Sequence, residues 1–338
     1  MPVRAALAVV GLALPLVAQE ATPARAVTIA IEGARAEIRL GELPFAGFRA
    51  DVPEGLTSVG TPVVYPLLGP GGIAMTRGYP FEPRDGEPRD HPHQRSFWFA
   101  HGGVNGVDFW ELREGGASIR HVAFVTGDGP ATDTLRTRNH WLDASGAVVC
   151  RDERSLRFFA DDGDTLRGVD STVTIHASEG ELRFSDTKEG TLGFRMRREL
   201  ALSGKGATGR LIDSEGRSGK AVWGKRARWI AYSGELDGTP MGVAILDHPG
   251  NLRHPTWWHA RDYGLAAANP FGQHDFEALP LDEHGHGPGD HVVAKGGTLV
   301  LRHRLLMFRG AAEPERIDAQ WRDFAATTTD QPQAETKR

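Results

Sequence analysis

The run Leu299-Val300-Leu301-Arg302-His303-Arg304-Leu305 puts leucines on one face of an extended chain and arginines on the other. Successive side chains of a strand point to opposite faces, so this spacing predicts a strand that is half buried. Similar short runs, separated by turn residues, recur over most of the chain: 27–31, 36–40, 63–68, 96–100, 119–125, 135–142, 148–159, 166–176, 181–185, 191–200, 221–232 and 241–246. The chain therefore reads as an all-β protein.

We expect a large antiparallel β-sandwich over residues 27–310, because no linker interrupts the strand pattern there. A helical period is found only in Glu313–Ala326, where Pro314 stands in the first turn. Its apolar residues are spaced i, i+4 and i+7, which predicts a helix packed on the sandwich: Ile317, Trp321 and Phe324. Residues 311–338 are then this helix and a disordered polar tail.

Composition narrows the function. The 338 residues include 39 Lys and Arg against 44 Asp and Glu, a net charge of −5, which argues against general nucleic-acid binding. The single cysteine, Cys150, excludes an intrachain disulfide and any metal site built from several cysteines. The 14 histidines are unusually many and direct attention to the segments that carry them.

The N-terminus has the pattern of a secretory signal peptide. Arg4 precedes an apolar run, Ala5 to Ala18, that is too short to span a bilayer. We expect cleavage after residue 18, or as late as residue 26, and a mature protein that is exported to the periplasm or outside the cell. The alternative is an N-terminal membrane anchor. No later stretch approaches a membrane span.

The first dense motif is Asp90-His91-Pro92-His93-Gln94-Arg95, followed by His101. His91, His93 and Arg95 alternate, so in an extended strand their side chains would point the same way. Such a face could bind an anion, bind a metal or carry out acid–base chemistry. The alternative is a hydrogen-bonded patch that pins a loop.

Two further motifs contain candidate functional residues. Lys188 and Glu189 stand between two predicted strands and form either a charged turn or a functional pair at a sheet end. The segment 248–272 holds histidines, aromatic residues and asparagines, which suit a sugar whose C–H faces stack on rings and whose hydroxyls form hydrogen bonds. Trp257 and Trp258 could instead simply close the end of the sandwich.

Together the motifs predict one site. The catalytic candidates are His93, His101, Asp108, Glu189 and His259. A histidine would be the general acid and a carboxylate the base. The substrate-binding candidates are His91, Arg95, Lys188, His248, Asn251, Trp257, Trp258, Tyr263 and Asn269.

These motifs resemble the PmoA-like family, a largely uncharacterised group of exported proteins that carry the name methane oxygenase PmoA. The resemblance covers most of residues 63–309 and rests on the segments 90–110, 186–190, 223–224, 247–263 and 268–272. Family members usually have a histidine where this chain has Gln94, so the resemblance assigns no role to that position. A methane monooxygenase subunit has several membrane spans, and this chain has none after residue 18.

The β-rich pattern is also similar, in fold and residue type only, to the galactose-mutarotase-like supersandwich, which implies acid–base work on a sugar at a concave sheet face. We therefore expect an exported carbohydrate-active enzyme: an epimerase, hydrolase or lyase. The alternatives are a non-catalytic sugar-binding protein and a non-haem metal oxygenase. No cofactor is predicted. Under the metal alternative, His91 and His93 would hold a divalent ion, although Arg95 on the same face would repel it.

Overall fold

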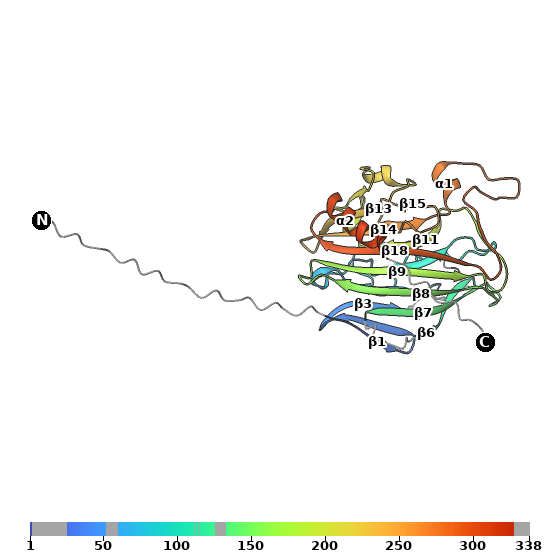
Figure 1. Cartoon of the computed structure of the whole chain (residues 1–338), viewed down its shortest axis with the longest axis horizontal. Coiled ribbons are helices and arrows are strands. Elements are labelled where there is room, and N and C mark those ends of the chain that lie inside the picture. The colour runs from blue at the N-terminus through green and yellow to red at the C-terminus, as the bar shows by residue number, and fades with distance from the viewer. Residues whose placement is uncertain (2–25, 52–59, 112, 114, 126–132, 328–338) are drawn as a thin grey trace.

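The computed structural model describes residues 1, 26–51, 60–111, 113, 115–125 and 133–327. Within these residues the chain forms two eight-stranded antiparallel sheets and a small two-stranded one (Figure 1). This confirms the predicted all-β sandwich. The predicted signal peptide and most of the polar tail lie outside the described residues.

The first sheet begins with a meander and ends with strands from the middle of the chain. Its spatial order is β1 (Val27–Glu32), β2 (Arg35–Leu40), β3 (Leu43–Arg49), β4 (Val63–Leu67), β5 (Phe97–His101), β11 (Gly190–Arg195), β16 (Leu265–Asn269) and β15 (Trp257–Ala260). The long connections that the chain makes between these strands carry most of the motif residues.

The second sheet contains the longer strands. Its order is β12 (Arg210–Asp213), β13 (Trp229–Leu236), β14 (Thr239–Asp247), β18 (Thr298–Arg309), β9 (Leu166–His176), β8 (Val148–Ala160), β7 (Thr134–Leu142) and β6 (Ser118–Phe124). The run that predicted a half-buried strand, Leu299–Leu305, lies in β18 and pairs with β9 and β14. A separate ribbon joins β10 (Leu182–Phe184) to β17 (His291–Val293).

Strand periodicity divides the apolar residues between two cores. In β13, Ile230 and Tyr232 belong to the main core, whereas Trp229 and Ala231 belong to a smaller cluster that includes Ile317. Alternate residues of a strand face opposite sides, so the second sheet is buried on both faces here.

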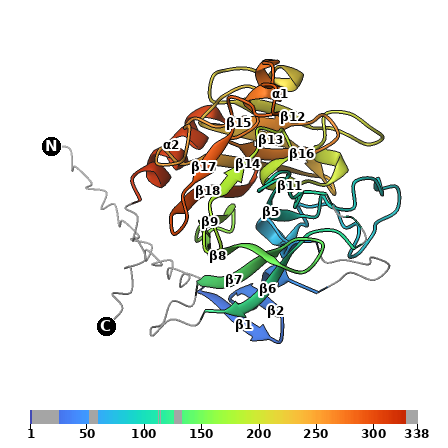
Figure 2. The same cartoon turned by 90° about the vertical axis from the view of Figure 1, so that its right-hand side faces the viewer.

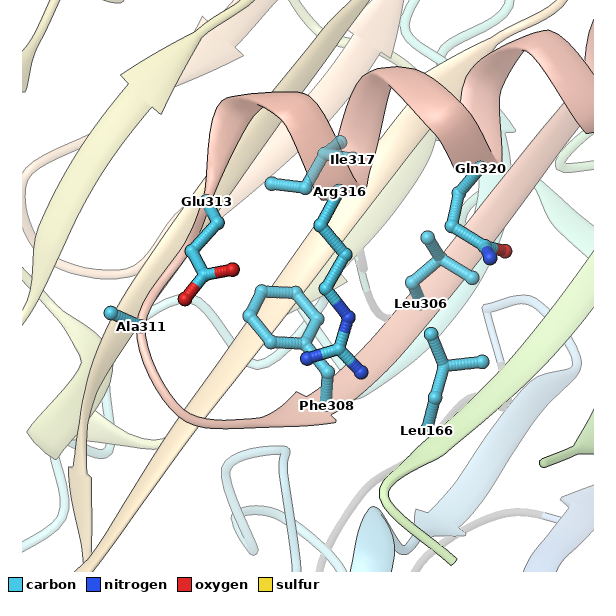
Figure 3. A pocket seen from close by; sticks show the side chains of 8 residues that line it. All are labelled: Leu166, Leu306, Phe308, Ala311, Glu313, Arg316, Ile317 and Gln320. Carbon is cyan, nitrogen blue, oxygen red and sulfur yellow. The ribbon is translucent and has the colours of Figure 1, made fainter. Parts of the chain in front are cut away.

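The second face is covered by α2 (Pro314–Ala325), which lies across β14 and β18 in Figure 1. Ile317 and Phe324 are buried against the sheet and Trp321 packs beside them, as the i, i+4, i+7 spacing predicts. A small apolar pocket opens between the helix and the sheet, with Glu313 and Arg316 among the residues that line it (Figure 3).

The remaining helices are short: α1 (Gln273–Glu277) and the 3-10 turns η1 (Pro70–Gly72), η2 (Arg198–Leu200) and η3 (Gly219–Val222). Figure 2 shows α1 near β15, away from α2, and shows the long connections before and after β5 gathered beside that strand. No helix in the described part of the chain is long and apolar enough to cross a membrane.

Candidate functional site

One row of residues crosses the first sheet beneath the loops. Trp98 of β5 pairs with Gly193 of β11, which aligns with Ala267 of β16 and then with His259 of β15. Paired residues of neighbouring strands share a face. The Trp98 ring lies over Gly193, where a Cβ would be 2.5 Å from Cζ2 of the indole. Glycine is therefore needed at position 193, and His259 stands on the face that carries Trp98.

The loop before β11 brings charged groups to this face. The backbone N–H of Lys188 donates to Oδ2 of Asp275 in α1 at 2.7 Å. The Lys188 Nζ atom lies 3.7 Å from Oε1 of Glu189 and 3.8 Å from Oδ1 of Asp275. We call Lys188, Glu189, His259 and Asp275 the Glu189 cluster, because a single loop joins these four residues from three elements.

The surroundings of Glu189 favour a protonated carboxyl group. Burial raises the pKa of Glu189, the charge of Lys188 opposes the shift, and the neighbouring carboxylates of Glu111 and Asp275 add to it. Its side chain is 31% exposed, so it remains reachable. A carboxyl group with a raised pKa can hold a proton and then deliver it.

His259 is oriented by the same loop. Its Nδ1 atom lies 3.0 Å from the carbonyl oxygen of Lys188. A carbonyl can only accept, so Nδ1 carries the hydrogen and Nε2 is the unprotonated nitrogen. Burial lowers the pKa of His259 to about 4, and the charge of Arg261 lowers it further. His259 is therefore neutral at pH 7 and suited to accept a proton.

An aromatic stack involves the turn between β15 and β16. The rings of His91 and Tyr263 are nearly parallel, 6° apart, with their centres separated by 5.4 Å. The guanidinium of Arg195 lies 4.4 Å from the centre of the Tyr263 ring, and that of Arg261 lies 5.5 Å from it. Gln94 donates to the Tyr263 hydroxyl at 3.3 Å. We call the His91–Tyr263 pair the Tyr263 stack.

Long-range charge effects connect the stack to the cluster. The Glu111 carboxylate raises the pKa of both His93 and Glu189, so it lies within electrostatic range of both. His93 lies edge-on to His91, with ring centres 5.6 Å apart, and burial lowers its pKa to about 4. Glu111 thus lies within electrostatic range of both the 91–95 turn and the Glu189 cluster.

The segment 91–95 is not the extended strand that the alternation predicted. The backbone N–H of Gln94 donates to the carbonyl oxygen of His91 at 3.0 Å, and His91 has a φ of 45°. The guanidinium of Arg77 holds this turn by donating to the carbonyl oxygens of Asp90, His91 and Gln94. Buried hydrogen bonds therefore outweigh the alternating pattern.

Two predicted site residues are buried away from the cluster. Arg95 is 1% exposed and donates to the carbonyl oxygen of Thr61, so the predicted ligand-binding role of Arg95 does not fit. His101 is fully buried on the other face of β5 from Trp98 and contacts the rings of Phe184 and Phe271. Its position suits packing and not catalysis.

Two more candidates lie beside α2, so the expected convergence is incomplete. Asn251 is tied to the Asp247 carboxylate at 2.7 Å and to both backbone groups of Arg302 in β18. The ring of His248 packs edge-on against Phe324 of α2. Asn251 secures the loop after β14 to β18, and His248 packs the same loop against α2.

Other candidate side chains contact the protein around the site and do not belong to the Glu189 cluster. Asn269 is fully buried, donates to the carbonyl oxygen of Thr187 and so fixes the loop that carries Glu189. The indole of Trp258 is fully buried in the main core. Trp257 donates to Glu277 of α1 at 2.9 Å. Asp108 accepts from the backbone N–H of Glu111, so it positions that residue.

The structure gives little support for a metal ion bound by His91 and His93. Nδ1 of His91 lies 3.0 Å from the Asp90 carboxylate. Within the residues that the structure describes, no group of three or more His, Cys, Asp or Glu side chains is placed to hold a metal ion.

Sequence reasoning missed two residues of the site. Asp275 lies three residues after the end of the Asn269-Pro270-Phe271-Gly272 motif, and this proximity in sequence was the available signal. Arg261 falls inside the aromatic segment 257–263 but gave no pattern of its own. Their proximity to Lys188 and Tyr263 depends on strand pairing across the first sheet.

Comparison with known proteins shows the family to which the chain belongs but gives no information on its activity. Residues 35–322 match the model described as a family of unknown function (DUF6807), which spans both sheets and the site. A search of the curated proteins finds no match. Because the match covers most of the chain, this protein belongs to the DUF6807 family.

Proposed function

We propose that this protein is a carbohydrate-active enzyme in which Glu189 acts as the general acid and His259 as the base. The observation that carries the proposal is the Glu189 cluster, where a partly buried carboxyl group and a neutral histidine meet through one loop, Lys188–Glu189. Enzymes that transfer protons hold groups of separated pKa in this way.

The assignment reverses the roles that the sequence suggested. A histidine with a pKa of about 4 holds almost no proton at pH 7, so His259 is a poor acid and an available base. Glu189, whose pKa is raised by burial, is the better proton donor. Lys188, close to both carboxylates of the cluster, is placed to hold a substrate oxygen.

The Tyr263 stack supports a sugar as the ligand. A pyranose ring offers C–H faces that pack on aromatic rings, and hydroxyls that need directed partners. The stack supplies aromatic rings, and the Glu189 cluster supplies donors and acceptors. Export remains part of the proposal and rests on residues 1–18 alone.

The test is a panel of sugars that carries common hexoses, hexuronates and their oligomers. Binding is measured by calorimetry, and product formation by proton NMR, for the wild type and for Glu189→Gln. The amide keeps the shape of the carboxyl group but cannot supply the proton. We expect binding within a few-fold of wild type and turnover reduced by about 100-fold or more.

The matched control is Glu283→Gln, because Glu283 is 87% exposed and far from charged partners other than His284. It should leave both measurements unchanged. Sugar binding by the wild type without any product would favour the sugar-binding alternative over an enzyme. Failure of every sugar to bind would overturn the proposal.

A further inference from the structure

We infer that the ligand of this site carries a carboxylate, as a hexuronate does, and that Arg261 is the residue that binds it. The inference rests on the proposed carbohydrate site and adds the chemical class of the sugar. It begins from the partners of each arginine near the Tyr263 stack.

Three arginines in this region already bind groups of the protein. Arg77 donates to the Asp90 carboxylate and to four carbonyl oxygens of the 88–94 turn. Arg195 donates to Gln94 at 2.7 Å and to Asp90 at 3.1 Å. Arg95 is buried and donates to Thr61. None of these three guanidinium groups is positioned for a ligand.

Arg261 differs from these three. It is partly buried, yet within the described part of the chain its guanidinium makes no hydrogen bond or ion pair. The neighbouring carboxylate of Asp262 is instead paired with Lys220 at 3.0 Å. A guanidinium has five N–H donors in a fixed fork, which match the two oxygens of a carboxylate. Arg261 therefore offers an unused anion-binding group.

The position of Arg261 ties it to the site. Its guanidinium lies 5.5 Å from the centre of the Tyr263 ring, and its charge acts on His259. It thus lies against the ring of Tyr263 and within electrostatic range of the proposed base. A carboxylate bound there would fix one end of the ring while Glu189 and Lys188 face another.

The surrounding charges favour a carboxylate over a phosphate. Asp90, Glu111 and Asp275 place several acidic groups around the region. A phosphate ester carries close to two negative charges at pH 7 and is repelled more strongly by these groups than a singly charged carboxylate.

The experiment measures binding by calorimetry at low salt for three sets of ligands. The first set is glucuronate, galacturonate and mannuronate, the second is the matching uncharged hexoses, and the third is the hexose 6-phosphates. Each set is tested on wild type, Arg261→Gln and Arg261→Lys. Arg136→Gln is the control, because Arg136 is an exposed arginine of β7.

We expect at least one hexuronate to bind more tightly than its hexose and its hexose phosphate. Arg261→Gln should weaken that binding by about 10- to 100-fold, the usual size for a hydrogen-bonded charge, and should leave hexose binding unchanged. Arg261→Lys keeps the positive charge but lacks the forked N–H donors of a guanidinium. Its affinity for the hexuronate should therefore lie between those of wild type and Arg261→Gln. The control variant should match wild type.

The outcomes separate this inference from the proposed function. Hexoses that bind wild type as tightly as hexuronates, or an Arg261→Gln variant that binds hexuronates as tightly as wild type does, would overturn the carboxylate assignment and leave the carbohydrate site standing. Tighter binding of the phosphates would also overturn it. No binding by any set would overturn both proposals.

Discussion

The Nδ1 atom of His259 lies 3.0 Å from the carbonyl oxygen of Lys188, so a strand at the edge of the first sheet orients the loop that carries Glu189. The bond fixes the tautomer of the ring and also the direction of the loop. A single hydrogen bond therefore links the proposed base to the proposed acid.

Replacing His259 with asparagine separates these two effects. The asparagine Nδ2 group can still donate to the Lys188 carbonyl oxygen, but the nitrogen that accepts a proton is gone. We expect turnover of the sugar selected from the panel to fall by about 100-fold or more, with little change in the unfolding midpoint. His284→Asn, at an exposed loop histidine, is the control. Unchanged turnover in His259→Asn would remove His259 from the mechanism.

The proposed roles predict an acidic pH optimum. The base must be neutral, so kcat/KM falls as the pH drops through about 4, the lowered pKa of His259. The acid must be protonated, so kcat/KM falls again as the pH rises through the raised pKa of Glu189. A pH–rate profile that rises steadily through pH 8 would contradict the assignment.

We expect Asn251 to contribute to the stability of the fold and not to ligand binding. Its amide joins Asp247 of β14 to the backbone of Arg302 in β18, and Asn251→Ala would leave these buried groups without partners. We expect a loss of about 2 to 3 kcal/mol in the free energy of unfolding. Denaturant titration and sugar binding are measured together, and weaker binding by the folded variant would restore Asn251 to the site.

Because several histidines are buried, we expect the fold to be less stable at acidic pH. Burial lowers the pKa of His101 and His303 to about 4, whereas the same groups titrate near 6.5 in the unfolded chain. Below pH 6.5 the unfolded state therefore binds more protons than the native state, and stability falls as the pH drops from 6.5 towards 4. At pH 5 each of these two histidines lowers the free energy of unfolding by about 2 kcal/mol.

The raised pKa of Glu189 acts in the opposite direction and offsets part of this loss. The measurement is the denaturant midpoint at pH 7.5 and pH 5.0. His303→Gln should reduce the difference between the two, and the exposed-site change His284→Gln should not. A midpoint that is higher at pH 5.0 would show that the histidines do not dominate.

Sequence patterns predicted the sandwich and the helix because both depend on local periodicity. The alternation in 298–308 appears as β18, and the spacing of Ile317, Trp321 and Phe324 appears as the buried face of α2. Short strands were harder to predict. The run 221–232 begins in η3 and continues into β13, and β15 and β16 fall inside the segment 248–272, where the sequence shows no strand-like run.

The site was predicted only in part because it depends on pairing between distant strands. The motifs singled out Lys188, Glu189 and His259, and in the structure Lys188 contacts both of the other two residues. They could not show that Arg95 turns inward or that Asn251 binds the second sheet. Those outcomes are decided by buried backbone groups that need partners, and the sequence does not display these.

The most direct test of the account is a crystal structure of Glu189→Gln with the tightest-binding sugar of the panel. The account predicts a sugar ring packed on the Tyr263 stack, with an oxygen within hydrogen-bond distance of residue 189 and a carboxylate on Arg261. A sugar bound elsewhere on the molecule, with residue 189 out of contact, would contradict it.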